Sequence, residues 1–198
     1  MRTAIIGFGK LGEAITRKLI RAGHTVLLTN SRGPASLQQK AIQLGELAVP
    51  AELADVAEAE VLFLTVPWST IPAVSKSLPE LSGKILVDVT NQFLPDMRLD
   101  DLKGKASSRI VQAHFPDVSL VKALNHYFEK WVDAEPVVGL GHRLAFIAGD
   151  DEQSKSVVAG LLSEFGFQPL DMGDIDTGSL AQQAGGPLAG LNVVSYPA

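Results

Sequence analysis

Residues 4–12 read Ala-Ile-Ile-Gly-Phe-Gly-Lys-Leu-Gly, so that Gly7, Gly9 and Gly12 form a G-x-G-x-x-G pattern near the start of the chain. The apolar residues before the pattern predict a buried strand, and the apolar stripe from Leu11 to Ala22 predicts a helix directly after it. In this setting the first glycine permits a tight turn, the second lets backbone approach a phosphate, and the third lets helix and strand pack closely. The helix N-terminus adds free N–H groups and a partial positive charge. The stretch therefore predicts a binding site for the diphosphate of a dinucleotide.

The composition is that of a globular protein, and it excludes several kinds of site. Of the 198 residues, 46% are hydrophobic and 20% are charged, which suits one domain with a sizeable core. The absence of cysteine excludes disulfides, thiolate metal sites and cysteine nucleophiles. A net charge of −5 without a basic cluster argues against nucleic-acid binding. No apolar run reaches the ~18 residues that would span a bilayer, and Met1-Arg2 leads straight into the first strand, so we expect a cytoplasmic protein without a membrane partner.

Strand and helix patterns alternate along most of the chain. This alternation predicts an α/β fold of the Rossmann type, a doubly wound, mostly parallel sheet with helices on both faces. We expect a single dinucleotide-binding domain over residues 1–198, with a Rossmann core over 1–150 and a small C-terminal α/β extension of helices and an edge strand over 151–198. Predicted strands cover residues 2–6, 25–29, 47–49, 61–66, 85–89, 120–123, 144–148 and 167–170; predicted helices cover residues 11–22, 35–44, 69–78, 106–115, 127–132, 149–165 and 177–194, the last one interrupted by Gly185-Gly186-Pro187.

The residues after the second predicted strand indicate which dinucleotide binds. NAD-binding proteins usually carry Asp or Glu at this position to accept a hydrogen bond from the ribose 2′-OH. Here the position reads Asn30-Ser31-Arg32, with no carboxylate to repel a 2′-phosphate. Ser31 can donate a hydrogen bond, and the planar guanidinium of Arg32 can pair with the phosphate or lie over the adenine. The alternative is an ordinary polar turn, but the preceding glycine pattern favours NADP(H).

The strongest predicted strand ends in Thr65-Val66-Pro67-Trp68, which we expect beside the bound cofactor. Ligands of doubly wound sheets bind beyond the carboxyl ends of the strands. The Thr65 hydroxyl and the backbone near Val66 would contact the diphosphate or the nicotinamide ribose, and Trp68 would form a wall of the site. In the structural alternative, Pro67 only ends the strand and Trp68 packs in the core.

The next two strand ends supply further candidates. Asn91 would bind on the nicotinamide side, whereas Asp88 is interpreted as a structural hydrogen-bonding residue. Asn125 would fix the nicotinamide carboxamide or a substrate carbonyl. His126 is a candidate for proton transfer, although a structural role is the favoured interpretation. No spacing typical of a metal site or of a Ser-His-Asp triad is present, and the remaining histidines are His24, His114 and His142.

In these segments the chain resembles the NADPH-dependent reductases of the deazaflavin coenzyme F-420, and it is similar to the cytosolic reductase domain of six-transmembrane metalloreductases. The resemblance spans nearly the whole chain, and its most specific parts are Thr65-Val66-Pro67-Trp68 and Val121-Lys122-Ala123-Leu124-Asn125. Further matching segments are Gly7 to Gly12, Asn30-Ser31-Arg32, Asp88-Val89-Thr90-Asn91, Gly149-Asp150-Asp151 and Gln168 to Gly173.

The resemblance implies hydride transfer between NADPH and a deazaflavin or flavin acceptor, which would be coenzyme F-420, FMN or FAD. Both reacting atoms then belong to bound cofactors, so the protein acts through proximity and orientation, without an obligatory acid, base or metal. The implied acceptor pocket includes the region of Gly185-Gly186-Pro187. The implied cofactor contacts are Gly7, Phe8, Gly9, Lys10, Leu11, Ser31, Arg32, Val66, Pro67, Trp68, Asn91 and Asn125, beside Gly12, Asn30 and Thr65 from the motifs themselves.

Two other functions remain open. A reductase of small carbonyl or imine substrates would add a helical C-terminal domain of roughly a hundred residues, whereas about 50 residues follow Asp150. A non-catalytic NADPH-binding sensor would lack an acceptor-sized pocket at the nicotinamide. The partner we expect is a small-molecule acceptor, and a homodimer is a further expectation, based on a closing helix that carries Leu180, Leu188, Leu191 and Val193.

Overall fold

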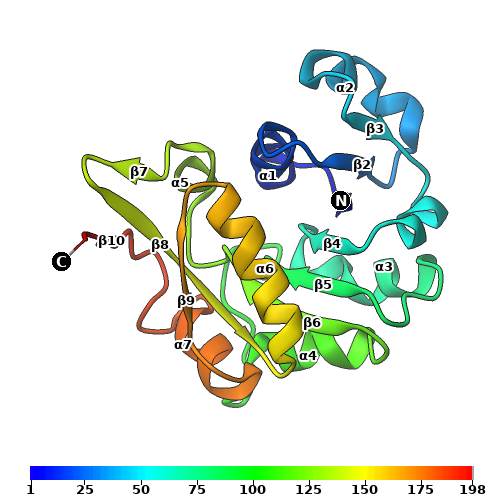
Figure 1. The fold of residues 1–198 in the computed structure, drawn as a ribbon. Helices are drawn as coiled ribbons and strands as arrows, with labels where there is room; N and C mark the ends of the chain where they lie inside the picture. Colours follow the sequence, from blue (N-terminus) through cyan, green and yellow to red (C-terminus); the bar gives the residue numbers. More distant parts are fainter. Residues whose placement is uncertain (198) are drawn as a thin grey trace.

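The computed structural model describes residues 1–197, and its centre is one large twisted sheet (Figure 1). Runs of β-branched and other apolar residues form its middle strands, which are buried on both faces. The strands are β1 (Arg2–Ile6), β2 (Thr25–Thr29), β3 (Ala48–Pro50), β4 (Val61–Leu64), β5 (Ile85–Asp88), β6 (Ser119–Ala123), β7 (Val137–Val138), β8 (Gly141–Gly149), β9 (Gln168–Asp171) and β10 (Val194–Ser195).

Helices cover both faces of the sheet and form two separate apolar cores. One core lies under α1, α5 and α6, and the other lies under α3 and α4. Their positions follow the predicted periodicity, since the buried stripe of α1 includes Ala14, Ile15 and Leu19. The helices are α1 (Lys10–Arg21), α2 (Gln38–Leu44), α3 (Ile71–Ser77), α4 (Ser107–His114), α5 (Glu129–Asp133), α6 (Glu152–Glu164) and α7 (Leu180–Gln182), joined by short 3-10 helices at Pro34–Leu37, Leu53–Glu58 and Trp68–Thr70 and a π-helical turn at Ile175–Ser179.

The strand order is β3-β2-β1-β4-β5-β6, with all neighbours parallel, and β8 then joins β6 antiparallel. The predicted doubly wound, mostly parallel α/β fold is therefore confirmed. From β1 the strands are added outward to β2 and β3, and the chain then returns to place β4, β5 and β6 on the other side of β1. Ligands of such sheets bind in the crevice where the strand order reverses, here between β1 and β4. The glycine turn that follows β1 lies at that crevice. Within residues 1–197, no helix is both long and apolar enough to cross a bilayer.

The predicted closing helix over residues 177–194 is wrong. Helical structure ends at Gln182, and the chain then turns back to form β10 against β8. Gly185 has a φ of +85°, which a helix cannot contain, and a Cβ at Gly186 would lie 2.5 Å from the Ala181 carbonyl oxygen. The homodimer prediction relied on this helix and loses that basis, although Leu180, Leu191 and Val193 remain exposed.

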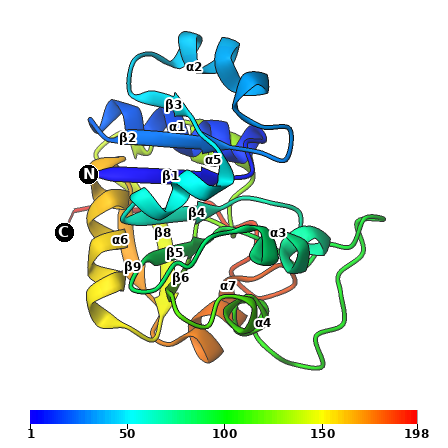
Figure 2. The same cartoon turned by 90° about the vertical axis from the view of Figure 1, so that its right-hand side faces the viewer.

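A long connection over residues 89–106 joins β5 to α4 and projects from the body of the molecule (Figure 2). Within it, an isolated antiparallel bridge pairs Phe93 with Leu99. Met97 lies between them with a positive φ of 66°. Side chains of this loop line two of the cavities described below.

Candidate functional site

The glycine turn between β1 and α1 is held by backbone and hydroxyl hydrogen bonds. Gly7 has a φ of +96°, a left-handed conformation that glycine adopts readily. The amides of Gly7 and Phe8 both donate to the Thr29 carbonyl of β2 at 3.1 Å, and the Thr65 hydroxyl donates to the Gly7 carbonyl at 2.5 Å. The amides of Gly7 and Phe8 are thus already used, so an anion at this turn needs other donors.

Those donors are the amides in the first turn of α1. Gly9 is the N-cap residue, and no side chain caps this helix. The N–H groups of Lys10, Leu11 and Gly12 have no partner within the helix, and they lie at its positive end. Nothing in the described chain lies within 4 Å of the position that a Cβ would take on Gly9. A diphosphate fits this arrangement, because its oxygens can approach the free amides across the open space at Gly9.

Gly12 has the opposite environment. A Cβ there would lie 2.8 Å from the Gly7 carbonyl oxygen, 2.9 Å from Ile5 Cγ2 and 3.0 Å from the Thr65 hydroxyl. The structure therefore agrees with the predicted roles of Gly7 in the tight turn and of Gly12 in the close contact between helix and strand.

The contrast between Gly9 and Gly12 gives a matched pair of variants. We expect Gly9→Ala to keep the unfolding free energy and to weaken NADPH binding by at least about tenfold, because the methyl group obstructs the diphosphate. Gly12→Ala should lower the unfolding free energy by about 1–3 kcal/mol through overpacking. Urea unfolding and NADPH titration of both variants test this. Loss of stability in Gly9→Ala without a change in affinity would refute the assignment.

A cavity of about 540 Å³ adjoins the glycine turn at the ends of β1, β2 and β4. The Asn30 side chain accepts a hydrogen bond from the Arg32 amide at 2.8 Å and donates one to the Ser36 hydroxyl at 3.0 Å, which shapes the loop after β2. Ser31 lines the cavity, whereas Arg32 is exposed at the next position. Within residues 1–197, the Arg32 guanidinium makes no ion pair and no acidic side chain lines this cavity. The remaining lining residues are Ile6, Gly7, Phe8, Gly9, Asn30, Leu53, Thr65, Val66, Pro67, Thr70 and Val74.

A larger cavity of about 890 Å³ begins at Lys10 and Leu11 of the same turn. The ends of β5 and β6 supply Asn91, Asn125 and His126, so the structure brings these three predicted residues together. Most of the other walls are apolar or aromatic. Gly185 belongs to the region that the resemblance implied for the acceptor pocket, whereas sequence reasoning missed the remaining walls, which come mostly from loops without periodicity. These walls are Phe93, Met97, Tyr127, Phe128, Glu129, Ala184, Gly185, Ala189 and Gly190.

Asn91 and Asn125 interlock. Asn91 Nδ2 donates to the Asn125 backbone carbonyl at 2.7 Å, and Asn125 Nδ2 donates to Asn91 Oδ1 at 3.1 Å and to the Gln182 carbonyl at 2.8 Å. The Ala184 amide also donates to Asn91 Oδ1, at 3.0 Å. Asn91 is therefore largely committed to positioning Asn125 and the segment after α7.

His126 is buried between two aromatic rings. Its ring centroid lies 4.0 Å from that of Tyr127 and 4.6 Å from that of Phe146, and 2% of the residue is exposed. Burial lowers the pKa of His126 to about 4, and the smaller effect of the Leu144 backbone carbonyl opposes it. The imidazole is neutral at neutral pH, so it does not serve as a cationic acid there.

The depressed pKa of His126 predicts a loss of stability in acid. The unfolded chain protonates this imidazole below about pH 6.5, whereas the folded protein keeps it neutral down to about pH 4. Unfolding free energy therefore falls by up to about 3 kcal/mol across that window. Denaturation at several pH values should show a flatter profile for His126→Phe than for the parent protein. The exposed His114→Ala variant is the control, and identical slopes in all three proteins would contradict the prediction.

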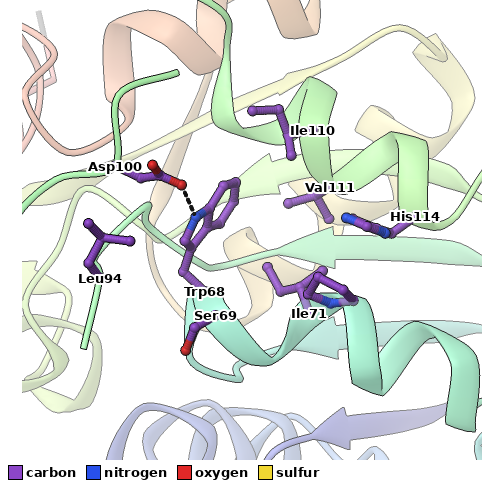
Figure 3. A pocket seen from close by; sticks show the side chains of 9 residues that line it. Trp68, Ser69, Ile71, Leu94, Asp100, Ile110, Val111 and His114 are labelled. Atoms are coloured by element: carbon purple, nitrogen blue, oxygen red, sulfur yellow. Dashed lines mark hydrogen bonds between the residues drawn. The ribbon is translucent and has the colours of Figure 1, made fainter. Parts of the chain in front are cut away.

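Trp68 lies apart from both cavities. Its indole Nε1 donates to Asp100 Oδ2 at 2.9 Å, and its ring lines a separate cavity of about 260 Å³ beside Ile110 and Val111 of α4 (Figure 3). Trp68 packs against the core under α3 and α4, which is the structural alternative considered from the sequence. Among the predicted contacts at this strand end, only Thr65, Val66 and Pro67 line the smaller cavity.

A fully buried ion pair supports the strand ends behind the larger cavity. Lys122 Nζ donates to Asp88 Oδ2 at 2.9 Å and to the Thr90 carbonyl at 2.6 Å, and both charged side chains are 0% exposed. The Ser108 hydroxyl donates to the same Asp88 oxygen at 2.7 Å. Asp88 thus has the structural role predicted for it, while the part played by Lys122 was not foreseen.

Residues 2–92 match the model of a family described as coenzyme F-420-dependent NADP oxidoreductases. The chain is 29% identical over 174 residues to the metalloreductase STEAP3 of Rattus norvegicus; the match covers 88% of this chain and 34% of that protein. The chain thus spans about a third of the length of this curated relative.

Solved structures extend the likeness over the whole fold. A hypothetical protein, SMa0349 of Sinorhizobium meliloti, is 34% identical with a TM-score of 0.91, covering 98% of this chain and 96% of its own. A protein described as an F-420-dependent NADP reductase from Arthrobacter sp. FB24 is 29% identical with a TM-score of 0.75, covering 88% and 86%. An imine reductase of Streptomyces aurantiacus shares the fold at 16% identity, with a TM-score of 0.64 over 90% and 58%.

Proposed function

We propose that this chain, whose residues 2–92 match the model of the family of coenzyme F-420-dependent NADP oxidoreductases, transfers hydride between NADPH and a deazaflavin or flavin acceptor. The observation that carries the proposal is the larger cavity, which starts at the glycine turn and whose volume of about 890 Å³ is in the range of small-molecule sites. Its aromatic and apolar walls suit a planar acceptor. Bound NADPH supplies the hydride.

The residues of the chain bind and orient the two ring systems. The free amides of Lys10, Leu11 and Gly12 neutralise the diphosphate at the positive end of α1. Ser31 and Arg32 bind the 2′-phosphate. This places the adenosine in the smaller cavity and directs the nicotinamide towards the larger one.

Other side chains of the larger cavity hold the reacting partners and exclude water. Asn125 contacts the ring system that is bound in the larger cavity. Phe93 and Phe128, which lie in the surrounding loops, cover that ring system. Proximity and orientation supply most of the rate enhancement in such a site. No acid or base is assigned an obligatory step.

One observation bears on the sensor function. A sensor without an acceptor has no need of a cavity of this size beside the nicotinamide. The larger cavity therefore favours hydride transfer to a flat acceptor over a sensor.

Anaerobic stopped-flow mixing tests the proposal. NADPH-loaded protein is mixed separately with coenzyme F-420, FMN, FAD and ferric chelates, with a panel of carbonyl and imine compounds in parallel. We expect rapid oxidation of NADPH by the deazaflavin or a flavin, and little oxidation when NADH replaces NADPH. Oxidation only by a carbonyl or an imine, or by nothing at all, would overturn the proposal.

A further inference from the structure

Two residues that line the larger cavity carry buried polar atoms that have no hydrogen-bond partner in the described chain. These atoms are Asn125 Oδ1 and both ring nitrogens of His126, although these residues are only 4% and 2% exposed. A buried polar atom without a hydrogen bond costs free energy, so native proteins keep few of them. Gln92 and Gln182 also carry such atoms, but neither residue lines the cavity.

The orientation of the Asn125 amide is set by its neighbours. Nδ2 donates to two oxygens, Asn91 Oδ1 at 3.1 Å and the Gln182 carbonyl at 2.8 Å. The oxygen of the same amide must therefore occupy the remaining position. Asn125 Oδ1 is thus a fixed, buried acceptor on a residue that lines the cavity, and it accepts no hydrogen bond from residues 1–197.

The imidazole of His126, like the Asn125 amide, is held in place by its neighbours. Tyr127 and Phe146 pack against its ring, and its backbone carbonyl accepts a hydrogen bond from Gly190 at 2.8 Å. The Tyr127 hydroxyl donates to the Leu144 carbonyl at 2.6 Å, and neither ring nitrogen of His126 has a hydrogen-bond partner within residues 1–197. A neutral imidazole has one N–H to donate. Asn125 and His126 therefore present an acceptor and a donor from adjacent positions of the chain.

We propose that Asn125 and His126 together recognise an amide edge of the bound ligand, in which an N–H stands beside a carbonyl. The ligand N–H donates to Asn125 Oδ1, and the ligand carbonyl accepts from the His126 ring. His126 is thereby a specificity-determining residue with an uncharged imidazole. The inference rests on the proposed function for the identity of the ligand.

Two ligands of that reaction carry this chemistry. One is the carboxamide of the nicotinamide, and the other is the imide edge of a flavin or deazaflavin ring. In either case the two hydrogen bonds fix how the ring lies in the cavity. They also select against an otherwise similar ring that lacks the N–H, because Asn125 Oδ1 would stay unpaired.

Binding measurements, which need no catalytic turnover, show which of these two ligands Asn125 and His126 recognise. In one arm, titration calorimetry compares NADPH with its 3-acetylpyridine analogue, in which a methyl group replaces the carboxamide nitrogen. In the other arm, FMN is compared with N3-methyl FMN on protein saturated with NADP⁺. We expect the ligand without the N–H to bind about 3- to 10-fold more weakly in one of the two arms. That arm identifies the recognised ligand.

Variants of His126 complete the test. His126→Phe keeps an aromatic ring of similar shape but loses the donor, and should weaken the ligand identified above by about 3- to 10-fold. His126→Gln returns a side-chain N–H donor and should restore part of the affinity. Thermal unfolding of both variants shows whether they are folded, and a purely structural histidine would give no difference between them in ligand affinity.

The outcomes are distinct from those of the proposed function. Equal binding of both members of each ligand pair, with unchanged affinity in His126→Phe, would overturn the amide-edge inference even if hydride transfer to a flavin is rapid. Discrimination against the acetylpyridine analogue would support it even if every flavin fails as an acceptor.

Discussion

Replacing Arg32 with alanine is expected to weaken NADPH binding about 10- to 100-fold and to leave NADH binding nearly unchanged. A charge-assisted contact contributes roughly 1.5–3 kcal/mol, which corresponds to that range of affinity. The side chain is exposed beside Ser31, and in the described chain it makes no ion pair that the substitution would break. The loss should therefore come from the 2′-phosphate, the group by which the two cofactors differ.

Arg32→Glu should lower NADPH affinity further, by more than about 100-fold, because a like charge then faces the phosphate. Titration of each variant with both cofactors measures the change in selectivity. Arg21→Ala serves as a control, since Arg21 is an exposed arginine in the last turn of α1, away from the glycine turn. Equal losses for NADPH and NADH would show that Arg32 does not read the phosphate.

Replacing Asp88 with alanine is expected to lower the unfolding free energy by about 3–5 kcal/mol, because it leaves the Lys122 ammonium buried without its counter-charge. Burial lowers the pKa of Lys122, and the Asp88 carboxylate opposes that shift. Without the carboxylate the buried lysine must lose its proton or the local packing must open. Either response destabilises the fold.

A double variant separates the effect of the unpaired buried charge from the effect of lost side-chain volume. Asp88→Asn combined with Lys122→Met removes both charges with little change in volume, and should recover most of the loss seen in Asp88→Ala. Urea unfolding followed by tryptophan fluorescence measures each variant. A loss below about 1 kcal/mol in Asp88→Ala would contradict the buried-charge account.

The same network bears on ligand binding. Lys122 donates to the Thr90 carbonyl, one residue before Asn91, and Asn91 holds Asn125. A folded Asp88 variant should therefore also bind NADPH more weakly. The effect on binding is secondary to the effect on stability.

Local patterns in the sequence were enough to predict the strands and helices that carry the cofactor turn. The shortness of a continuous apolar run such as Val61 to Leu64 favours a buried strand, and the glycine spacing has one common geometry between strand and helix. Such signals depend on residues within a few positions of each other. They also placed Asn30, Ser31, Asn91 and Asn125 at strand ends.

The features that were missed depend on partners far along the chain. Trp68 points towards Asp100, 32 residues later, and no local pattern encodes that contact. The apolar stripe before Val194 suggested a helix, but the positive φ of Gly185 and the pairing of β10 with β8 decide otherwise. Most of the walls of the larger cavity that were missed come from loops, whose positions follow from tertiary packing.

A crystal structure of the protein with NADPH tests the central claim most directly. We expect the diphosphate against the amides of Lys10 to Gly12, the 2′-phosphate beside Ser31 and Arg32, and the nicotinamide in the cavity lined by Asn125. Density for the cofactor elsewhere, or a crevice closed by the Phe8 ring, would contradict the account.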